Sequence, residues 1–259
     1  MSSPRLLGVI GLTASLALLP VAPAESQQSS SQQNSSQQNS SQQNSSQQKK
    51  EADKKAAAPV VAAPVYKPPL RGAPGGRLGG GTRGTGRDVF VLSVLAPDHS
   101  GLTQHEQPSL YWYISNPTAL PVEFTIMDPT AVQPLLEMRI PGPISAGIHE
   151  IRLADHGIRL APDAVYRWYV AVVPDSGRRS RDILAGGTIQ RITLAPDVAA
   201  KLQARPADEA PFIYAEAGLW YDALAAMSAL IQRNPENNEL RQRRAALVAQ
   251  VGLPSVAGQ

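Results

Sequence analysis

The nine-residue run LAPDAVYRW, residues 160–168, constrains the fold of this chain more than any other stretch. Leu160 is followed two residues later by Pro162 and four residues after that by Tyr166, at the start of an apolar run. In immunoglobulin-like sandwiches, a tyrosine at such a corner between sheets hydrogen-bonds through its hydroxyl to upstream backbone. The run therefore predicts an antiparallel, immunoglobulin-like β-sandwich, and this architecture specifies no reaction.

Seven short segments have strand character, and turn residues such as Pro, Gly, Asn and Asp separate them. They are residues 89–95, 109–115, 122–127, 135–140, 147–153, 164–173 and 188–194. Regularly spaced short strands with turn chemistry between them are typical of a sandwich or barrel. We therefore expect a mainly β fold, with the sandwich at residues 88–195.

Alternation of apolar and polar residues predicts which side chains face the core. The inward sets are Leu110, Trp112 and Ile114; Val122, Phe124 and Ile126; and Tyr166, Trp168, Val170 and Val172. Trp112 and Trp168 are expected to face each other across the sheets as core residues. Tyr111, Tyr113 and Tyr169 then point outward, and they are the candidate contact surface.

After the strands the apolar period changes from two to about 3.6 residues, which is typical of a helix. One helical stripe contains Trp220, Ala223, Leu224, Met227, Leu230 and Ile231. The offsets of Tyr214, Gly218, Ala223, Met227, Leu230 and Pro235 partly match a tetratricopeptide repeat. A single repeat cannot bury its own apolar face. We therefore expect a helical tail at residues 206–252 that docks on the sandwich, with a second copy or a repeat-containing partner as alternatives.

The N-terminal segment predicts export. Arg5 precedes an apolar stretch at residues 6–19, and Ala22-Pro23-Ala24 has the small-x-small pattern of a signal peptidase site. The stretch is shorter than the ~20 residues that a membrane-spanning helix needs. A signal peptide at residues 1–24 is expected, which leaves no transmembrane segment in the mature chain and places it in the periplasm or outside the cell.

Residues 25–87 have the composition of a disordered tether. The pentapeptide SSQQN recurs from Ser30 to Asn44, and Ala/Pro-rich and Arg/Gly-rich stretches follow. Residues 49–87 contain nine Lys or Arg against two acids, whereas residues 88–259 contain 14 against 18. The basic tether is expected to touch anionic polymers or lipid headgroups. Because the chain is expected to be exported, nucleic acid is not an expected partner of its Arg-Gly alternation.

Few residues carry recognisable chemistry. The chain has no cysteine, so disulfides and thiolate catalysis are excluded. His99 and His105 share a loop with Asp98 and Glu106, but their spacing matches no standard zinc signature, and two solvated histidines are the preferred interpretation. Neither a nucleophile elbow nor a phosphate loop is present, and no cofactor is expected.

Several short motifs together resemble one bacterial family. They are PPLRGAPGGRLGGGTRG at 68–84, VLAP at 94–97, SLYWYI at 109–114, YRWYV at 166–170, AGGTIQRI at 185–192 and AGLWYDAL at 217–224. The chain is similar over about residues 66–253 to the family named domain of unknown function 928. The resemblance implies an exported sandwich with helices, and it assigns no catalytic residue.

The sequence thus predicts an exported, non-enzymatic interaction module of the cell envelope, with an envelope or secreted protein as its partner. The alternative is a carbohydrate-binding or hydrolytic accessory domain that uses the three outward tyrosines or the His99 to Glu106 loop. Trp112, Trp168 and Trp220 are expected to serve the structure, as are the corner residues Leu160, Pro162 and Tyr166.

Overall fold

The structure is a computed structural model that describes residues 62–69, 76–79, 82–83, 90–128 and 130–253. The predicted signal peptide, the SSQQN repeat and the basic run at 49–55 lie outside the described residues. Within the described residues, no helix is long and apolar enough to cross a membrane.

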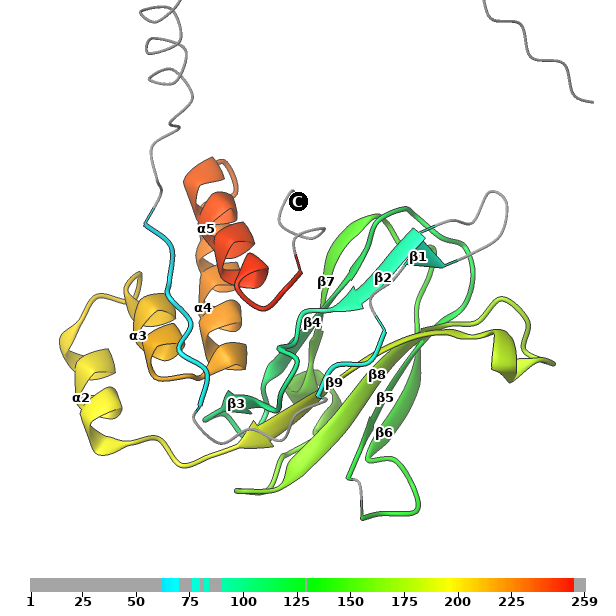
Figure 1. The fold of residues 1–259 in the computed structure, drawn as a ribbon, viewed down its shortest axis with the longest axis horizontal. Helices are drawn as coiled ribbons and strands as arrows, with labels where there is room; N and C mark the ends of the chain where they lie inside the picture. Colours follow the sequence, from blue (N-terminus) through cyan, green and yellow to red (C-terminus); the bar gives the residue numbers. More distant parts are fainter. Residues whose placement is uncertain (1–61, 70–75, 80–81, 84–89, 129, 254–259) are drawn as a thin grey trace, which may run out of the picture. The chain divides into compact units, whose positions relative to one another are not determined.

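Two β-sheets contribute to one apolar core (Figure 1). The four-stranded sheet has the order β1 (Thr82–Arg83), β2 (Phe90–Val94), β4 (Ser109–Ile114), β7 (Gly147–Arg152). The five-stranded sheet has the order β3 (Gly101–Thr103), β9 (Ile183–Arg191), β8 (Val165–Val172), β5 (Val122–Met127), β6 (Leu136–Ile140). Each of the seven predicted strands is present, and every strand pair is antiparallel except β3 with β9.

Strand β9 begins at Ile183, five residues before the predicted start at Thr188. Gly186 and Gly187 suggested a turn, but both lie within the strand, where large rings cover them. A Cβ on Gly186 would lie 2.4 Å from the ring of Tyr169, and one on Gly187 would lie 3.2 Å from Nε1 of Trp168. The glycines therefore allow the rings of β8 to approach the backbone of β9.

The predicted inward faces of β5 and β8 are buried, with side chains between 0% and 4% exposed. At the corner before β8, the Ala161 amide donates to the Tyr166 hydroxyl at 3.0 Å, and Leu160 is 1% exposed while Pro162 lies at the surface. The predicted bond from Tyr166 to upstream backbone is therefore present. Trp112 and Trp168 make no ring contact in the described structure: Trp112 stacks on His149, and Trp168 packs against Phe124 and Tyr221.

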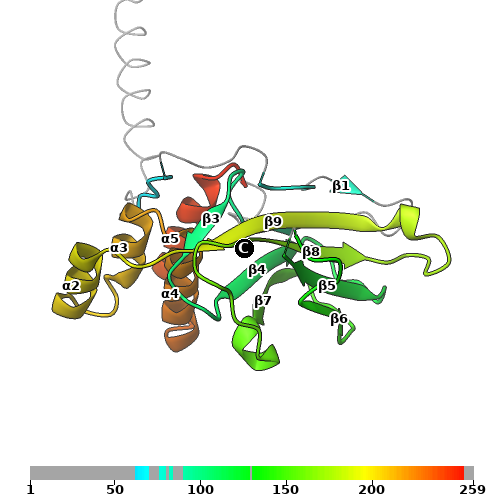
Figure 2. The same ribbon diagram turned by 90° about the horizontal axis from the view of Figure 1, so that it is seen from below.

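Four α-helices follow the strands in the described part of the chain (Figure 2). They are α2 (Pro196–Ala204), α3 (Ala210–Glu216), α4 (Trp220–Arg233) and α5 (Asn238–Ala249), and two short 3-10 helices, η2 (Leu153–His156) and η3 (Arg179–Arg181), lie between strands. The prediction of a mainly β protein is thus wrong in its proportions. The architecture is mixed, because helix α2 extends the helical part and the helices share the core of the sheets.

The first turn of α4 is bonded to the five-stranded sheet and to Leu95, the residue that follows β2. Trp220 Nε1 donates to the carbonyl oxygen of Leu95 at 2.8 Å, and Trp220 is fully buried. The Tyr221 hydroxyl accepts from Trp168 Nε1 and donates to the Thr188 carbonyl, both at 2.9 Å. These buried bonds satisfy polar groups at the point where helix and sheets meet, so the position of α4 on the sheets is well specified.

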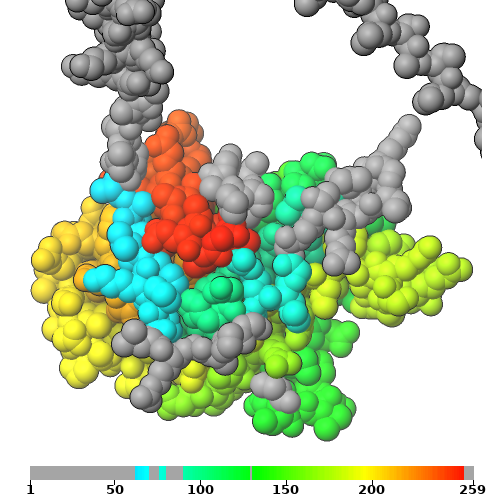
Figure 3. Space-filling view, viewed as in Figure 1, coloured from blue at the N-terminus to red at the C-terminus, as the bar shows by residue number. Residues whose placement is uncertain are grey.

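The prediction that residues 25–87 are disordered is wrong for residues 62–69, which form an ordered segment that we call the strap. Gln250 accepts from the Tyr66 amide at 2.9 Å and donates to the Pro64 carbonyl at 2.8 Å. The Lys67 amide donates to the Ala215 carbonyl at 3.0 Å. In Figure 3 the cyan atoms of the strap lie against the orange and red atoms of the C-terminal helices.

Tyr66 supplies the apolar contact that orders the strap. Its side chain is 8% exposed, and its ring meets Trp220 edge-on with centroids 5.0 Å apart. Its hydroxyl lies 2.9 Å from Nε2 of His99. This buried aromatic residue therefore fixes the strap to the helices and to the loop of His99.

Candidate functional site

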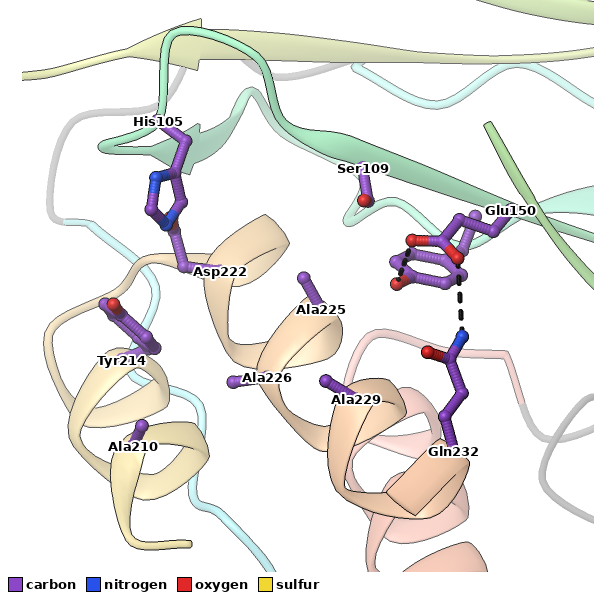
Figure 4. Close-up of a pocket in the computed structure, with 11 residues that line it drawn as sticks. His105, Ser109, Glu150, Ala210, Tyr214, Asp222, Ala225, Ala226, Ala229 and Gln232 are labelled. Atoms are coloured by element: carbon purple, nitrogen blue, oxygen red, sulfur yellow. Dashed lines mark hydrogen bonds and ion pairs between the residues drawn. The ribbon is translucent and has the colours of Figure 1, made fainter. Parts of the chain in front are cut away.

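A pocket of about 370 Å³ lies where helices α3 and α4 meet strands β4 and β7 (Figure 4). Its walls come from the loop after β3, from both strands and from both helices. The lining residues are His105, Ser109, Tyr111, Glu150, Ala210, Tyr214, Asp222, Ala225, Ala226, Ala229 and Gln232. No Lys or Arg is among them, so its ionisable lining is a histidine, two tyrosines and two acids.

One face of α4 provides the wall on the helical side. Ala225, Ala229 and Gln232 follow one another at helical spacing, and Asp222 begins the same face one turn earlier. The short alanine side chains leave space between the helix and β4. The opposite face of α4 carries the apolar stripe, of which Trp220, Ala223, Leu224 and Met227 are fully buried.

Asp222 is a carboxylate enclosed at one end of the pocket. Its Oδ2 accepts from the Gln104 amide at 3.1 Å, and its Oδ1 accepts from the Thr103 hydroxyl at 3.3 Å. Burial raises the pKa of Asp222 from its usual 3.8 to about 7, although the bonds from Gln104 and Thr103 oppose this shift. The carboxyl group can therefore carry a proton near neutral pH.

His105 and Tyr214 stand beside Asp222 at the mouth of the pocket. His105 Nε2 lies 3.4 Å from Asp222 Oδ1, and the histidine side chain is more than half exposed. Burial of its remaining part lowers the pKa of His105 below its usual value. The Tyr214 hydroxyl accepts from Gln104 Nε2 at 2.7 Å, and burial raises its pKa, so it remains a neutral phenol.

At the other end of the pocket, Tyr111 and Glu150 form a fixed pair from neighbouring strands. The Tyr111 hydroxyl donates to Glu150 Oε1 at 2.8 Å, and Gln232 Nε2 lies 3.4 Å from Glu150 Oε2 (Figure 4). Burial, with the charge of Glu150 as a smaller cause, raises the pKa of Tyr111. This end therefore presents a neutral phenol beside a carboxylate, with an amide from α4 across from them.

The expectation that Tyr111 and Tyr113 form an exposed contact surface is wrong, because both side chains are only 4% exposed. They do lie on the outward face of β4, but helix α4 packs against that strand. Tyr111 therefore contributes to the wall of a pocket instead of an open surface.

Tyr169 lies on β8 in the other sheet, beside a separate depression of about 160 Å³. Arg167, Thr188 and Leu78 are among its other lining residues. The structure brings Tyr111 and Tyr113 together on one strand and leaves Tyr169 elsewhere, so the three tyrosines do not form one site.

The two histidines of the predicted loop have different partners. Nδ1 of His99 lies 3.1 Å from Asp98 and Nε2 lies 2.9 Å from the Tyr66 hydroxyl, whereas His105 faces Asp222. Among the residues that the structure describes, no three His, Cys, Asp or Glu side chains group as metal ligands. His99 therefore belongs to the attachment of the strap, and His105 belongs to the pocket.

A family model described as Domain of Unknown Function (DUF928) matches residues 78–259. The chain belongs to the DUF928 family. The family predicted from the sequence is thereby confirmed, although the match begins at residue 78, later than the predicted start at about residue 66. Every residue that lines the pocket of this DUF928 chain lies within the matched range. No curated protein and no solved structure matches the chain.

Sequence reasoning missed Asp222, the buried acid of the site whose pKa is raised to about 7. Asp222 follows Trp220 and Tyr221 in the first turn of α4, where an acid is ordinarily explained by the helix dipole. An acid within the otherwise apolar run LWYDAL was the available signal that this DUF928 helix buries a carboxyl group.

Proposed function

We propose that this DUF928 chain is an exported, non-enzymatic interaction module of the cell envelope, and that it holds a segment of a protein partner in the pocket between α4 and β4. The observation that carries the proposal is the pocket itself. Its volume suits one or two side chains, its alanine wall is apolar, and its two ends carry hydrogen-bonding groups. Recognition sites commonly combine an apolar wall with a few fixed polar groups.

Binding is favoured over catalysis because the polar groups of the pocket already have hydrogen-bond partners within the chain. Tyr111 donates to Glu150, and Asp222 accepts from backbone and side chain of the β3 loop. Ser109 has its hydroxyl in the same pocket, but Figure 4 draws it apart from His105 with no bond between them. A nucleophile held by a base, the arrangement that covalent catalysis requires, is therefore not assembled here.

The apolar stripe of α4 is not available to a second copy or to a repeat-containing partner, because its residues are buried in contacts within the chain. Trp220 and Leu224 are fully buried. Met227 packs with Leu230 of the same helix and with Leu240 of α5. The remaining face of α4, which lines the pocket, is the one left for a partner. We therefore place binding at the pocket.

Two finer structural assignments belong to this proposal. The bond between Ala161 and Tyr166 supports an immunoglobulin-like sandwich. The contact of the consecutive helices α3 and α4 supports a partial tetratricopeptide-like pair. Export, a periplasmic or extracellular location and contact of the basic tether with anionic polymers or lipids are proposed from the sequence alone.

The test is co-purification from native envelope extract with three baits: the unaltered chain, Ala229→Trp and Ala249→Trp. Ala229 is an exposed residue of the pocket wall, so an indole there fills the pocket without entering the core. Ala249 is exposed on α5 outside the pocket and is the matched control. We expect a stoichiometric partner with the unaltered and Ala249→Trp baits and at least a tenfold loss with Ala229→Trp. A partner retained equally by all three, or by none, contradicts the proposal.

The second candidate is a hydrolytic accessory activity, and the Asp222 and His105 pair favours it. A carboxyl with a pKa of about 7 that lies 3.4 Å from an imidazole can exchange a proton near neutral pH. Assay of purified protein on esters and glycosides, beside Asp222→Asn, tests this candidate. Turnover that disappears in the variant would favour it over binding.

A further inference from the structure

Strand β6 is the last strand of the five-stranded sheet, and among the described residues it pairs only with β5 (Figures 1 and 2). An edge strand leaves a row of backbone amides and carbonyls on its outer side that can pair with another strand. The sequence of β6 is LEMRI, and its side chains alternate between half-buried and exposed. Leu136, Met138 and Ile140 pack toward the core, while Glu137 and Arg139 face solvent.

Glu137 and Arg139 are opposite charges without an ion pair in the described part of the chain. The acid that lies across from Arg139 in the ladder is Glu123. Glu123 is held instead by Arg179, with two bonds of 2.6 and 3.2 Å. Arg139 adds a smaller charge attraction to Glu123 without forming an ion pair with it. The Glu137 carboxylate and the N–H groups of Arg139 can therefore bond to a strand that pairs with the edge.

The pattern of β6 complements itself in one antiparallel register. When two copies pair about a two-fold axis through Met138, Glu137 of each lies opposite Arg139 of the other, and Leu136 lies opposite Ile140. A two-fold axis through residue 137 or 139 would instead oppose two like charges, which is destabilising. A slip of one residue would set charged side chains against apolar ones on the same face.

The residues that flank β6 fit the same register. Val132 is 99% exposed and Leu135 is 41% exposed, so apolar side chains stand unburied just before the strand. In the Met138-centred register Leu135 of one copy comes opposite Pro141 of the other. Proline has no amide to donate, so pairing ends there and is confined to the five residues of β6. Self-pairing would cover Leu135 and place Glu137 of each copy opposite Arg139 of the other.

We propose that β6 is a self-association edge, through which two copies of this chain join their five-stranded sheets in an antiparallel, Met138-centred pair. The competing explanation is that Glu137 and Arg139 are charges that protect the edge from pairing. The partner-binding pocket lies on the other sheet and on the helices, so this inference does not depend on the proposed function.

The absence of cysteine from the chain allows a direct test. In the full chain, expressed with its leader, Met138→Cys introduces a single thiol at the proposed axis, where opposite Cβ atoms would be about 4.5–5.5 Å apart. We expect a disulfide-linked dimer under mild oxidation. Arg178→Cys places a single thiol on an exposed loop and is the control, for which we expect no dimer band.

Charge exchange tests the register in the same chain without oxidation. Glu137→Arg and Arg139→Glu each place like charges opposite one another twice in the interface, and we expect each to weaken dimerisation roughly tenfold in sedimentation analysis. The double exchange restores both pairs and should restore the dimer. A monomeric unaltered chain at high concentration, equal crosslinking of the two thiol variants, or failure of the double exchange to recover dimerisation would each overturn the proposal.

Discussion

At the scale of single residues, Asp222 is the buried acid whose protonation the fold changes near neutral pH. Its raised pKa means that between about pH 4 and pH 7 the folded chain binds a proton that the unfolded chain releases. The contribution of Asp222 to stability therefore declines as the pH rises through that window. His105 also faces this carboxyl group, and its lowered pKa acts with the opposite sign.

We predict that Asp222→Asn flattens the decline in stability between pH 4 and pH 7. The amide oxygen still accepts from Gln104 and Thr103, but the side chain no longer ionises. The variant should match the unaltered chain near pH 4 and exceed its free energy of unfolding above pH 7, by at most on the order of 4 kcal/mol. Urea denaturation across this range measures the effect.

Asp197→Asn, at an exposed position of α2, is the control and should leave the pH profile unchanged. If Asp222→Asn proved less stable than the unaltered chain at pH 8, the carboxyl would be charged and favourable in the fold. That result would contradict a raised pKa.

At the scale of elements, alternation was enough to locate the strands but not the parts that depend on distant contacts. The inward face of β5 was predictable because every second residue is apolar. Strand β3 has only three residues, and it is formed by pairing with the distant strand β9. Its own sequence therefore contains no alternation long enough to predict a strand. The strap was missed because its composition resembles a tether, while its order depends on Trp220 and His99, which lie far along the chain.

We predict that Tyr66→Ala lowers the free energy of unfolding by about 3 kcal/mol, since it removes a buried ring and leaves a cavity against Trp220. Val65→Ala is the neighbouring control, because Val65 is 63% exposed, and it should change stability by less than about 0.5 kcal/mol. Thermal or denaturant unfolding of the full chain compares them. Equal effects of the two substitutions would mean that the strap is not part of the core.

At the scale of the whole molecule, the pocket exists because segments far apart in sequence meet. Tyr111 and Glu150 lie 39 residues apart in the sequence, on different strands, and Gln232 of α4 lies 82 residues after Glu150. A single sequence indicates that α4 has an apolar stripe, but it does not indicate which strand the opposite face will oppose. The family and the strands were therefore predictable, whereas the site was not.

We predict that one side of α4 meets a partner, and site-specific photo-crosslinking in cells tests this most directly. A photoreactive residue would replace Gln232, at the rim of the pocket, or Gln242, an exposed glutamine of α5 outside it. We expect a crosslinked partner from position 232 that is absent from position 242 and is lost when Ala229→Trp is added. No adduct at 232, or the same adduct from both positions, would contradict binding at the pocket.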